Sequence, residues 1–229
     1  EHKTKAPVSR KIPHVQDWPF TKVEAKQLQS KSVSKWFSQV KLAPQLAMDM
    51  ALIPSGDFAM GSVEGAADEL PVSAVKINQA FWMSRHEITN EQFAAFDPLH
   101  DSRIEDKNAY QFGIHGYPSN EPHQPVVRVT WQEAMAFCHW LSSKTGRRFT
   151  LPTEAQWEWA CRAGASTPFH YGNLDTDFSQ HANFADSKLT EFASDPYTVD
   201  TPLLQPTPYD DWIPKDDRFN DHALIAIAP

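Results

Sequence analysis

The alternation of apolar and polar residues predicts an N-terminal arm, a patterned centre and a C-terminal third with no regular period. In the arm, apolar side chains recur at helical spacing between Val33 and Val40, which predicts a helix from Pro19 to about Val40. Residues 1–17 are rich in Lys, Pro and Ser and are expected to form a flexible lead-in. The body of the protein is then expected to begin at Met48.

The first half of the body shows strand patterns. Residues 50–62, MALIPSGDFAMGS, consist of two short apolar runs around a Pro-Ser-Gly turn, which predicts a β-hairpin. Residues 74–88 contain alternating apolar and polar positions, which favours strand structure. A further short strand is predicted at 125–129, PVVRV.

Three helices are predicted from one shared start signal. Thr89, Thr130 and Thr153 are each followed three residues later by Gln or Glu. This pattern is a capping box, in which the hydroxyl accepts from a backbone N–H and the Gln or Glu side chain reaches back. The second helix is expected to end at Gly146 and the third at Gly164.

Residues 165–229 show no sustained period but contain many Asp, Pro and scattered aromatic residues. An irregular stretch of this length is uncommon inside a compact domain. The aromatic residues argue against disorder, so we expect ordered loops held by core packing, a metal or another chain.

The charge is unevenly distributed along the 229 residues. Residues 1–45 carry 9 Lys/Arg and 3 Asp/Glu, whereas the rest of the chain carries 12 and 26. We therefore divide the chain into a basic N-terminal arm with a short helix, residues 1–47, and a body, residues 48–229. The arm could be a solvated segment, or it could dock on the body or on an anionic partner. An acidic body repels phosphate, so no nucleic-acid partner is expected.

Membrane and secretion signals are not evident in the sequence. No run approaches the ~20 apolar residues that a membrane helix needs, so no membrane span is expected. There is no signal peptide, and the chain begins at Glu1 without Met, which is typical of a processed or trimmed N-terminus.

Common catalytic and metal motifs are absent from the sequence, including HExxH, CxxC, GxSxG and a phosphate-binding glycine loop. Cys138 and Cys161 lie inside predicted helices, which favours structural cysteines. They could form one disulfide, remain buried thiols or pair with cysteines elsewhere. The Glu154/Glu158 pair, with Arg162 nearby, is read as a solvated charged edge and not as paired catalytic carboxylates. The tryptophans of LPTEAQWEWACRAG (151–164) are expected to pack the core.

Two polar loops rich in Asn and Asp, HANFADS (181–187) and RFNDHALIA (218–226), offer the oxygen ligands that Ca²⁺ prefers. Taken alone, this signal is generic.

Four stretches in this order resemble the formylglycine-generating enzyme (sulfatase-modifying factor) family. They are IPSGDFAMGS, RHEITNEQFAAF, PVVRVTWQEAMAFCHWLSSKTGRRFTLPTEAQWEWACRAG and HANFAD, and the resemblance extends from residue 50 to about 190. It implies an α+β, C-type-lectin-like fold with little regular secondary structure. Family enzymes oxidise a sulfatase cysteine to formylglycine with O₂ and a copper ion held by two cysteines. Relatives use the same fold as binding or structural modules.

The sequence departs from the family pattern at its end. Family members continue past a TAPVG segment into a GNVWEW-type motif and the copper-binding cysteines, whereas this sequence stops at IAIAP (225–229). The resemblance therefore implies an N-terminal portion, incomplete at the C-terminus, with no catalytic residue in this chain. Cys138 and Cys161 match positions that form structural disulfides with the later part of the family domain.

The resemblance also implies ligands and partners. A structural Ca²⁺ site would use Asn183, Phe184, Asp221 and Ala223, and copper would bind only if the remaining part carries the cysteine pair. The expected partners are a second chain or the missing C-terminal segment, together with a sulfatase-type peptide. The stretch DWPFTKVEAKQLQ (17–29) is similar to extensions of bacterial secreted members, so a secreted or periplasmic location is expected. The alternative function is a non-catalytic, lectin-like binding or structural subunit of an extracytoplasmic complex.

Overall fold

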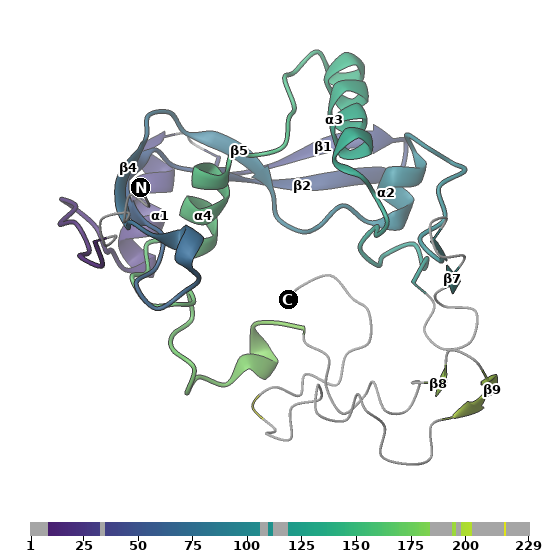
Figure 1. The fold of residues 1–229 in the computed structure, drawn as a ribbon. Coiled ribbons are helices and arrows are strands. Elements are labelled where there is room, and N and C mark those ends of the chain that lie inside the picture. The colour runs from purple at the N-terminus through teal and green to yellow at the C-terminus, as the bar shows by residue number, and fades with distance from the viewer. Residues whose placement is uncertain are drawn as a thin grey trace, which may run out of the picture. The chain divides into compact units, whose positions relative to one another are not determined.

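The fold combines short helices with several small sheets (Figure 1). The computed structural model describes residues 9–32, 35–105, 110–111, 119–183, 194–195, 198–202 and 218. The helices are α1 (Lys22–Ser32), η1 (Ala67–Glu69), α2 (Asn90–Ala94), α3 (Trp131–Thr145), α4 (Glu154–Arg162) and η2 (Phe178–Gln180). The strands are β1 (Phe37–Ala43), β2 (Leu46–Ile53), β3 (Gly56–Met60), β4 (Ser73–Ile77), β5 (Phe81–Ser84), β6 (Ile104–Glu105), β7 (Tyr110–Gln111), β8 (Ser194–Asp195) and β9 (Thr198–Pro202).

The strands pair differently from the prediction. One sheet has the order β1–β2–β5, and β3 pairs with β4 in an antiparallel register that runs from Gly56↔Ile77 to Met60↔Ser73. Both strands of the predicted 50–62 hairpin exist, but β2 and β3 belong to different sheets, so the hairpin itself is wrong. The predicted strand at 125–129 is also wrong, because its pairing is limited to an isolated bridge between Thr89 and Pro125.

The N-terminal arm is only partly helical. The predicted helix is confirmed at α1 but is wrong from Phe37 onward, where β1 begins. The apolar stripe that suggested a helix includes Val40, which is buried as part of a strand. The flexible lead-in is wrong at Val15, whose side chain is 7% exposed. The division at residue 47 stays a prediction.

The three capping boxes are confirmed. The hydroxyls of Thr89, Thr130 and Thr153 accept the backbone N–H three residues later, at 3.2–3.3 Å. The Gln or Glu at that position accepts the N–H of the threonine in return. Helix α3 ends at Gly146 and α4 ends just before Gly164, as predicted, and both glycines have positive φ.

Backbone contacts divide the chain into two compact units. Unit 1 takes the described residues within 1–38, 51–83 and 152–175, and unit 2 takes those within 39–50, 84–151 and 176–229. In unit 1, α4 lies against the β3–β4 pair. Its core is built around Phe58, Ile77 and Trp159, with a second cluster of Val15, Ala59 and Val72.

Unit 2 has an aromatic and aliphatic core between the strands β1 and β2 and the helices α2 and α3. The rings of Phe93 and Phe137 stack at 5.6 Å, and Leu141 is 1% exposed. The side-chain amide of Gln92 donates to the carbonyl of Ala47 at 3.1 Å and ties α2 to β2. Phe137, Cys138 and Leu141 thus form the buried face of α3.

We expect Gly146→Ala to destabilise the protein by about 1 kcal/mol, because a Cβ is disfavoured at positive φ. The φ of Gly146 is +68°, and a Cβ there would meet no atom within 4 Å, so the cost is one of backbone conformation alone. Chemical denaturation measures it. Gly146→Asn is the matched control and should lose less, since Asn tolerates this region. Equal stability of Gly146→Ala and the wild type would contradict the assignment.

Candidate functional site

The predicted calcium ligands fall largely outside the described residues. Asn183 is half-buried and follows η2, whereas Phe184, Asp221 and Ala223 lie outside the described residues. Within the described ranges, no three His, Cys, Asp or Glu side chains gather as metal ligands. The calcium site therefore stays a prediction.

The carboxylate of Glu158 is held inside unit 1. Its Oε1 accepts from Nε of Arg162 at 2.7 Å and from the backbone N–H of Gly61 at 2.9 Å. Arg162 Nη2 also donates to the carbonyl of Gly61 at 2.8 Å. The predicted solvated edge is correct for Glu154, which is exposed, but wrong for Glu158. The ion pair between Glu158 and Arg162 fixes the turn at Gly61. Glu154 and Glu158 therefore do not form a paired-carboxylate site.

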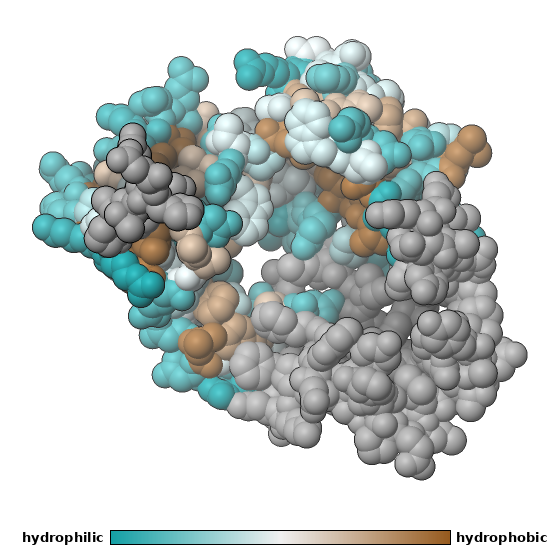
Figure 2. Space-filling model, in the orientation of Figure 1, coloured by the Kyte–Doolittle hydropathy of each residue, from teal (hydrophilic) through white to brown (hydrophobic). Residues whose placement is uncertain are grey.

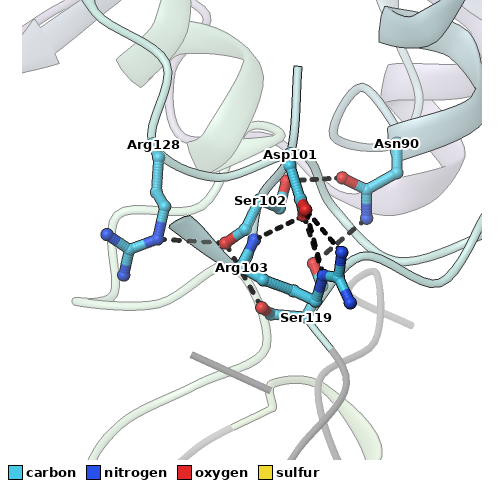
Figure 3. Close-up of polar contacts among 6 residues, drawn as sticks. All are labelled: Asn90, Asp101, Ser102, Arg103, Ser119 and Arg128. Atoms are coloured by element: carbon cyan, nitrogen blue, oxygen red, sulfur yellow. Dashed lines mark hydrogen bonds and ion pairs between the residues drawn. The ribbon is translucent and has the colours of Figure 1, made fainter. Parts of the chain in front are cut away.

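A cluster of buried and half-buried polar side chains is centred on Ser102 in unit 2 (Figure 3). We call it the Ser102 cluster; its members are Asn90, Asp101, Ser102, Arg103, Ser119 and Arg128. The hydroxyl of Ser102 donates to Oδ1 of Asn90 at 2.5 Å. The carbonyl of Ser102 accepts from Ser119 Oγ at 3.2 Å and from Arg128 Nε at 3.0 Å.

Asn90, the first residue of α2, links the Ser102 cluster to the segment at 119–124. Its side-chain nitrogen lies 3.2 Å from the carbonyl of Ser119, 2.9 Å from that of Glu121 and 3.3 Å from that of Gln124. Ser102 and Ser119 are both buried. Buried polar groups need such partners, because an unpaired one costs about 1–3 kcal/mol.

The ion pair of the cluster joins Asp101 to Arg103. Arg103 Nη2 donates to Oδ2 of Asp101 at 2.6 Å, and Nε donates to Oδ1 at 3.0 Å. The donation from the Arg103 side chain holds the pKa of the Asp101 carboxyl below its usual value. Both side chains are partly exposed, so the pair contributes modestly to stability.

The chemistry of the Ser102 cluster is structural and not nucleophilic. An activated serine donates to a histidine or carboxylate base, whereas Ser102 donates to a neutral amide oxygen. Arg128 has φ +64°, an uncommon conformation for a residue other than glycine, and its contact with Ser102 holds it there. The arrangement fixes the ends of neighbouring loops relative to α2.

Sequence reasoning missed the Ser102 cluster. Its residues come from segments up to 38 positions apart, from Asn90 to Arg128, and they follow no period. One local signal was present: the N–H of Arg103 donates to Oδ1 of Asp101 at 3.0 Å, a turn that Asp typically forms.

An open cavity of about 440 Å³ lies between residues 14–20 and α1. Its lining mixes rings and aliphatic groups with charged side chains such as Asp17 and Lys31. Within the described part of the chain, the indole N–H of Trp18 is buried without a hydrogen-bond partner. Among the described residues that line this cavity, no three His, Cys, Asp or Glu side chains gather as metal ligands.

Comparison with known proteins identifies the family. The sequence profile of the Sulfatase-modifying factor enzyme 1-like domain matches residues 36–209. The chain belongs to this family. The predicted membership and α+β fold are thereby confirmed, and the match begins one residue before β1.

Two kinds of named relatives share the sulfatase-modifying-factor domain. Serine/threonine-protein kinase pkn1 of Chlamydia pneumoniae is 34% identical over 182 residues, which make up 72% of this chain and 28% of that protein. The formylglycine-generating enzyme of Thermomonospora curvata is 29% identical over 187 residues, covering 63% of this chain and 59% of that enzyme. The chain thus spans less than two thirds of either relative.

A solved structure supports the family fold. The structure of PvdO from Pseudomonas aeruginosa matches with a TM-score of 0.56 at 25% sequence identity. The match covers 79% of this chain and 71% of that one.

The two cysteines lie on different helices and do not pair with each other. Cys138 is buried in α3, Cys161 is exposed on α4, and both are free thiols. Desolvation raises the pKa of both thiols, although the side chain of Cys161 is exposed.

Among the described residues, no helix of this sulfatase-modifying-factor chain is long and apolar enough to cross a bilayer.

We expect Asp101→Asn to reduce the free energy of unfolding at neutral pH by up to about 1 kcal/mol. The pKa of Asp101 is depressed in the folded state, so its contribution is present above the unfolded pKa and is lost as the pH falls through the folded pKa. The difference between wild type and variant should therefore be largest above pH ~5 and close toward pH ~2. Urea denaturation at several pH values measures this difference. A gap that stays constant or widens in acid would contradict the ion pair.

Proposed function

We propose that this chain forms the N-terminal part of a formylglycine-generating-enzyme-like domain. In this proposal the complete domain oxidises a sulfatase cysteine to formylglycine with copper, and its catalytic cysteines lie outside this chain. The similarity to the Thermomonospora curvata enzyme, over 63% of this chain and 59% of that enzyme, carries the proposal.

The role we propose for this chain is to build the scaffold of the domain. Among the described residues, the polar side chains of the Ser102 cluster and Glu158 are engaged in internal contacts. We also propose a structural Ca²⁺ at Asn183, Phe184, Asp221 and Ala223, and a secreted or periplasmic location.

Exposed aromatic side chains support a partner for this scaffold. Figure 2 shows hydrophobic residues at the surface of the described part, set among hydrophilic ones. Trp131 and Trp157 are 65% and 56% exposed. The prediction that both tryptophans of 151–164 pack the core is therefore confirmed for Trp159 and wrong for Trp157. Two residues apart on α4, one indole faces inward and the other outward. We propose that a second chain or a C-terminal segment of the same protein covers these rings.

We expect this 229-residue chain in isolation to self-associate or to unfold without cooperativity. Burial of apolar surface stabilises a protein by about 25 cal/mol per Å², and this stabilisation is lost where the surface stays exposed. The loss matters because the net stability of a domain is only about 5–15 kcal/mol. Sedimentation velocity and thermal denaturation measure both properties. A monodisperse monomer that unfolds cooperatively would rule out the need for a partner.

A second candidate function is a non-catalytic, lectin-like binding or structural subunit. The similarity to a Chlamydia pneumoniae protein named as a kinase favours it, because the shared region makes up only 28% of that protein. The domain therefore also occurs within a protein of a different named activity. We do not extend the kinase activity to this chain, whose sequence contains neither HRD nor DFG.

The two functions are separated by an oxidation assay on the full-length gene product. Copper(I)-loaded protein in air, with a thiol reductant that supplies two electrons per turnover, is expected to convert a CxPxR peptide to the aldehyde while the sulfur leaves as sulfide and O₂ is reduced to water. Mass spectrometry detects the change in peptide mass. The matched control peptide carries Ser in place of Cys and should remain unchanged. An unchanged CxPxR peptide would exclude the oxidase and leave the binding subunit.

A further inference from the structure

Residues 14–20 lie before the region that the family profile matches, yet they are built into unit 1. We call them the N-terminal strap. The backbone N–H of Phe20 donates to the carbonyl of Gly164 at 3.0 Å, directly after α4. Its ring meets the ring of Trp159 edge-on, with 5.5 Å between centroids. Hydrogen bonding and ring packing thus fix the strap at the same end of α4.

Gly164 leaves the space that Phe20 fills. A Cβ at Gly164 would lie 2.3 Å from two carbons of the Phe20 ring, which is closer than atoms pack. The φ of Gly164 is +91°, so a glycine is also favoured by its backbone conformation. Gly164, which follows the end of α4, therefore also leaves room for the Phe20 ring.

Trp159, which packs against the Phe20 ring, is held by further contacts of its own. Trp159 is 3% exposed, and its indole N–H donates to the carbonyl of Pro54 at 2.8 Å. Its ring also contacts Phe58 at a centroid distance of 5.4 Å. The contacts with Pro54 and Phe58 involve no strap residue, so they hold Trp159 in addition to the packing of Phe20 on its ring.

The strap makes further contacts along its length. Val15 is 7% exposed and shares a core cluster with Ala59 and Val72. Trp18 packs against both core clusters of unit 1. Helix α1 follows the strap and is fixed in turn, because Gln29 Nε2 donates to the carbonyl of Leu52 at 2.8 Å.

We propose that unit 1 carries a binding slot for an irregular aromatic segment with a turn at residues 16–17, and that the strap of the same chain is its occupant. The slot is formed by Gly164, Trp159, Phe58, Ala59 and Val72. The occupant is recognised by an apolar residue at position 15, an aromatic ring at position 20 and the N–H of position 20. The strap lies outside the region that the family profile matches, whereas the slot residues lie inside it. The proposal does not depend on any oxidase activity.

A displaced-strap variant of the full chain tests the slot. Val15→Asp with Phe20→Ala removes two of the three side chains that anchor the strap, and Trp18 is the third. A fluorescent peptide of residues 9–32 should bind this variant and should not bind the wild type, whose slot is occupied. The same peptide carrying both substitutions is the matched control and should not bind. Failure of the wild-type peptide to bind the folded variant, or equal binding to both proteins, would overturn the proposal.

Amide hydrogen exchange on the wild-type chain keeps the proposal testable if the variant does not fold. The amide of Phe20 should exchange at least about tenfold more slowly than that of Ile12, which precedes the strap and is exposed. Equal exchange rates at the two positions would show that the strap is not docked. Val23→Ala, at an exposed site on α1, should leave the protection of Phe20 unchanged.

Discussion

The indole of Trp159 joins three segments of unit 1 that lie far apart in the sequence. Its N–H donates to the carbonyl of Pro54, and its ring contacts Phe58 of β3 and Phe20 of the strap. The backbone passes so close at Gly56 that a Cβ there would lie 2.7 Å from the ring. The rest of unit 1 depends on this side chain, because α4, the β3–β4 pair and the strap are all positioned against it.

Unit 2 is held by two different kinds of interaction. Its core is apolar, with Phe93 of α2 stacked on Phe137 of α3. Its irregular segments are instead fixed by the Ser102 cluster, in which one serine contacts three other side chains. A buried polar network of this kind selects one loop arrangement, because any alternative leaves some of its groups unpaired. Hydrogen bonds between side chains and backbone thus do in this unit what sheets and long helices do in more regular folds.

Local features of the fold could be predicted from the sequence, and long-range pairing could not. The helix starts at Thr89, Thr130 and Thr153 are set by residues three positions away, so the pattern alone contains the information. The partner of β3 is decided by packing on Trp159, about 100 residues later, and the sequence around a Pro-Ser-Gly turn favours the nearest strand instead. The strap escaped prediction because an irregular segment with a turn at residues 16–17, fixed by isolated side chains, has no period. Of the four Ca²⁺ ligands inferred from the family, Asn183 alone belongs to the described residues.

The contact between Trp159 and Pro54 also sets an order of events during synthesis. The two residues are 105 positions apart, and the strap lies a further 34 positions before Pro54. A chain that emerges from the ribosome N-terminus first therefore exposes Phe20 long before α4 and Gly164 exist to receive it. Short helices such as α2 and α4 are marginal until they pack, and the core of unit 1 must wait for residue 164. During that interval the aromatic residues of the strap are free to bind a chaperone, and docking of the strap ends that opportunity.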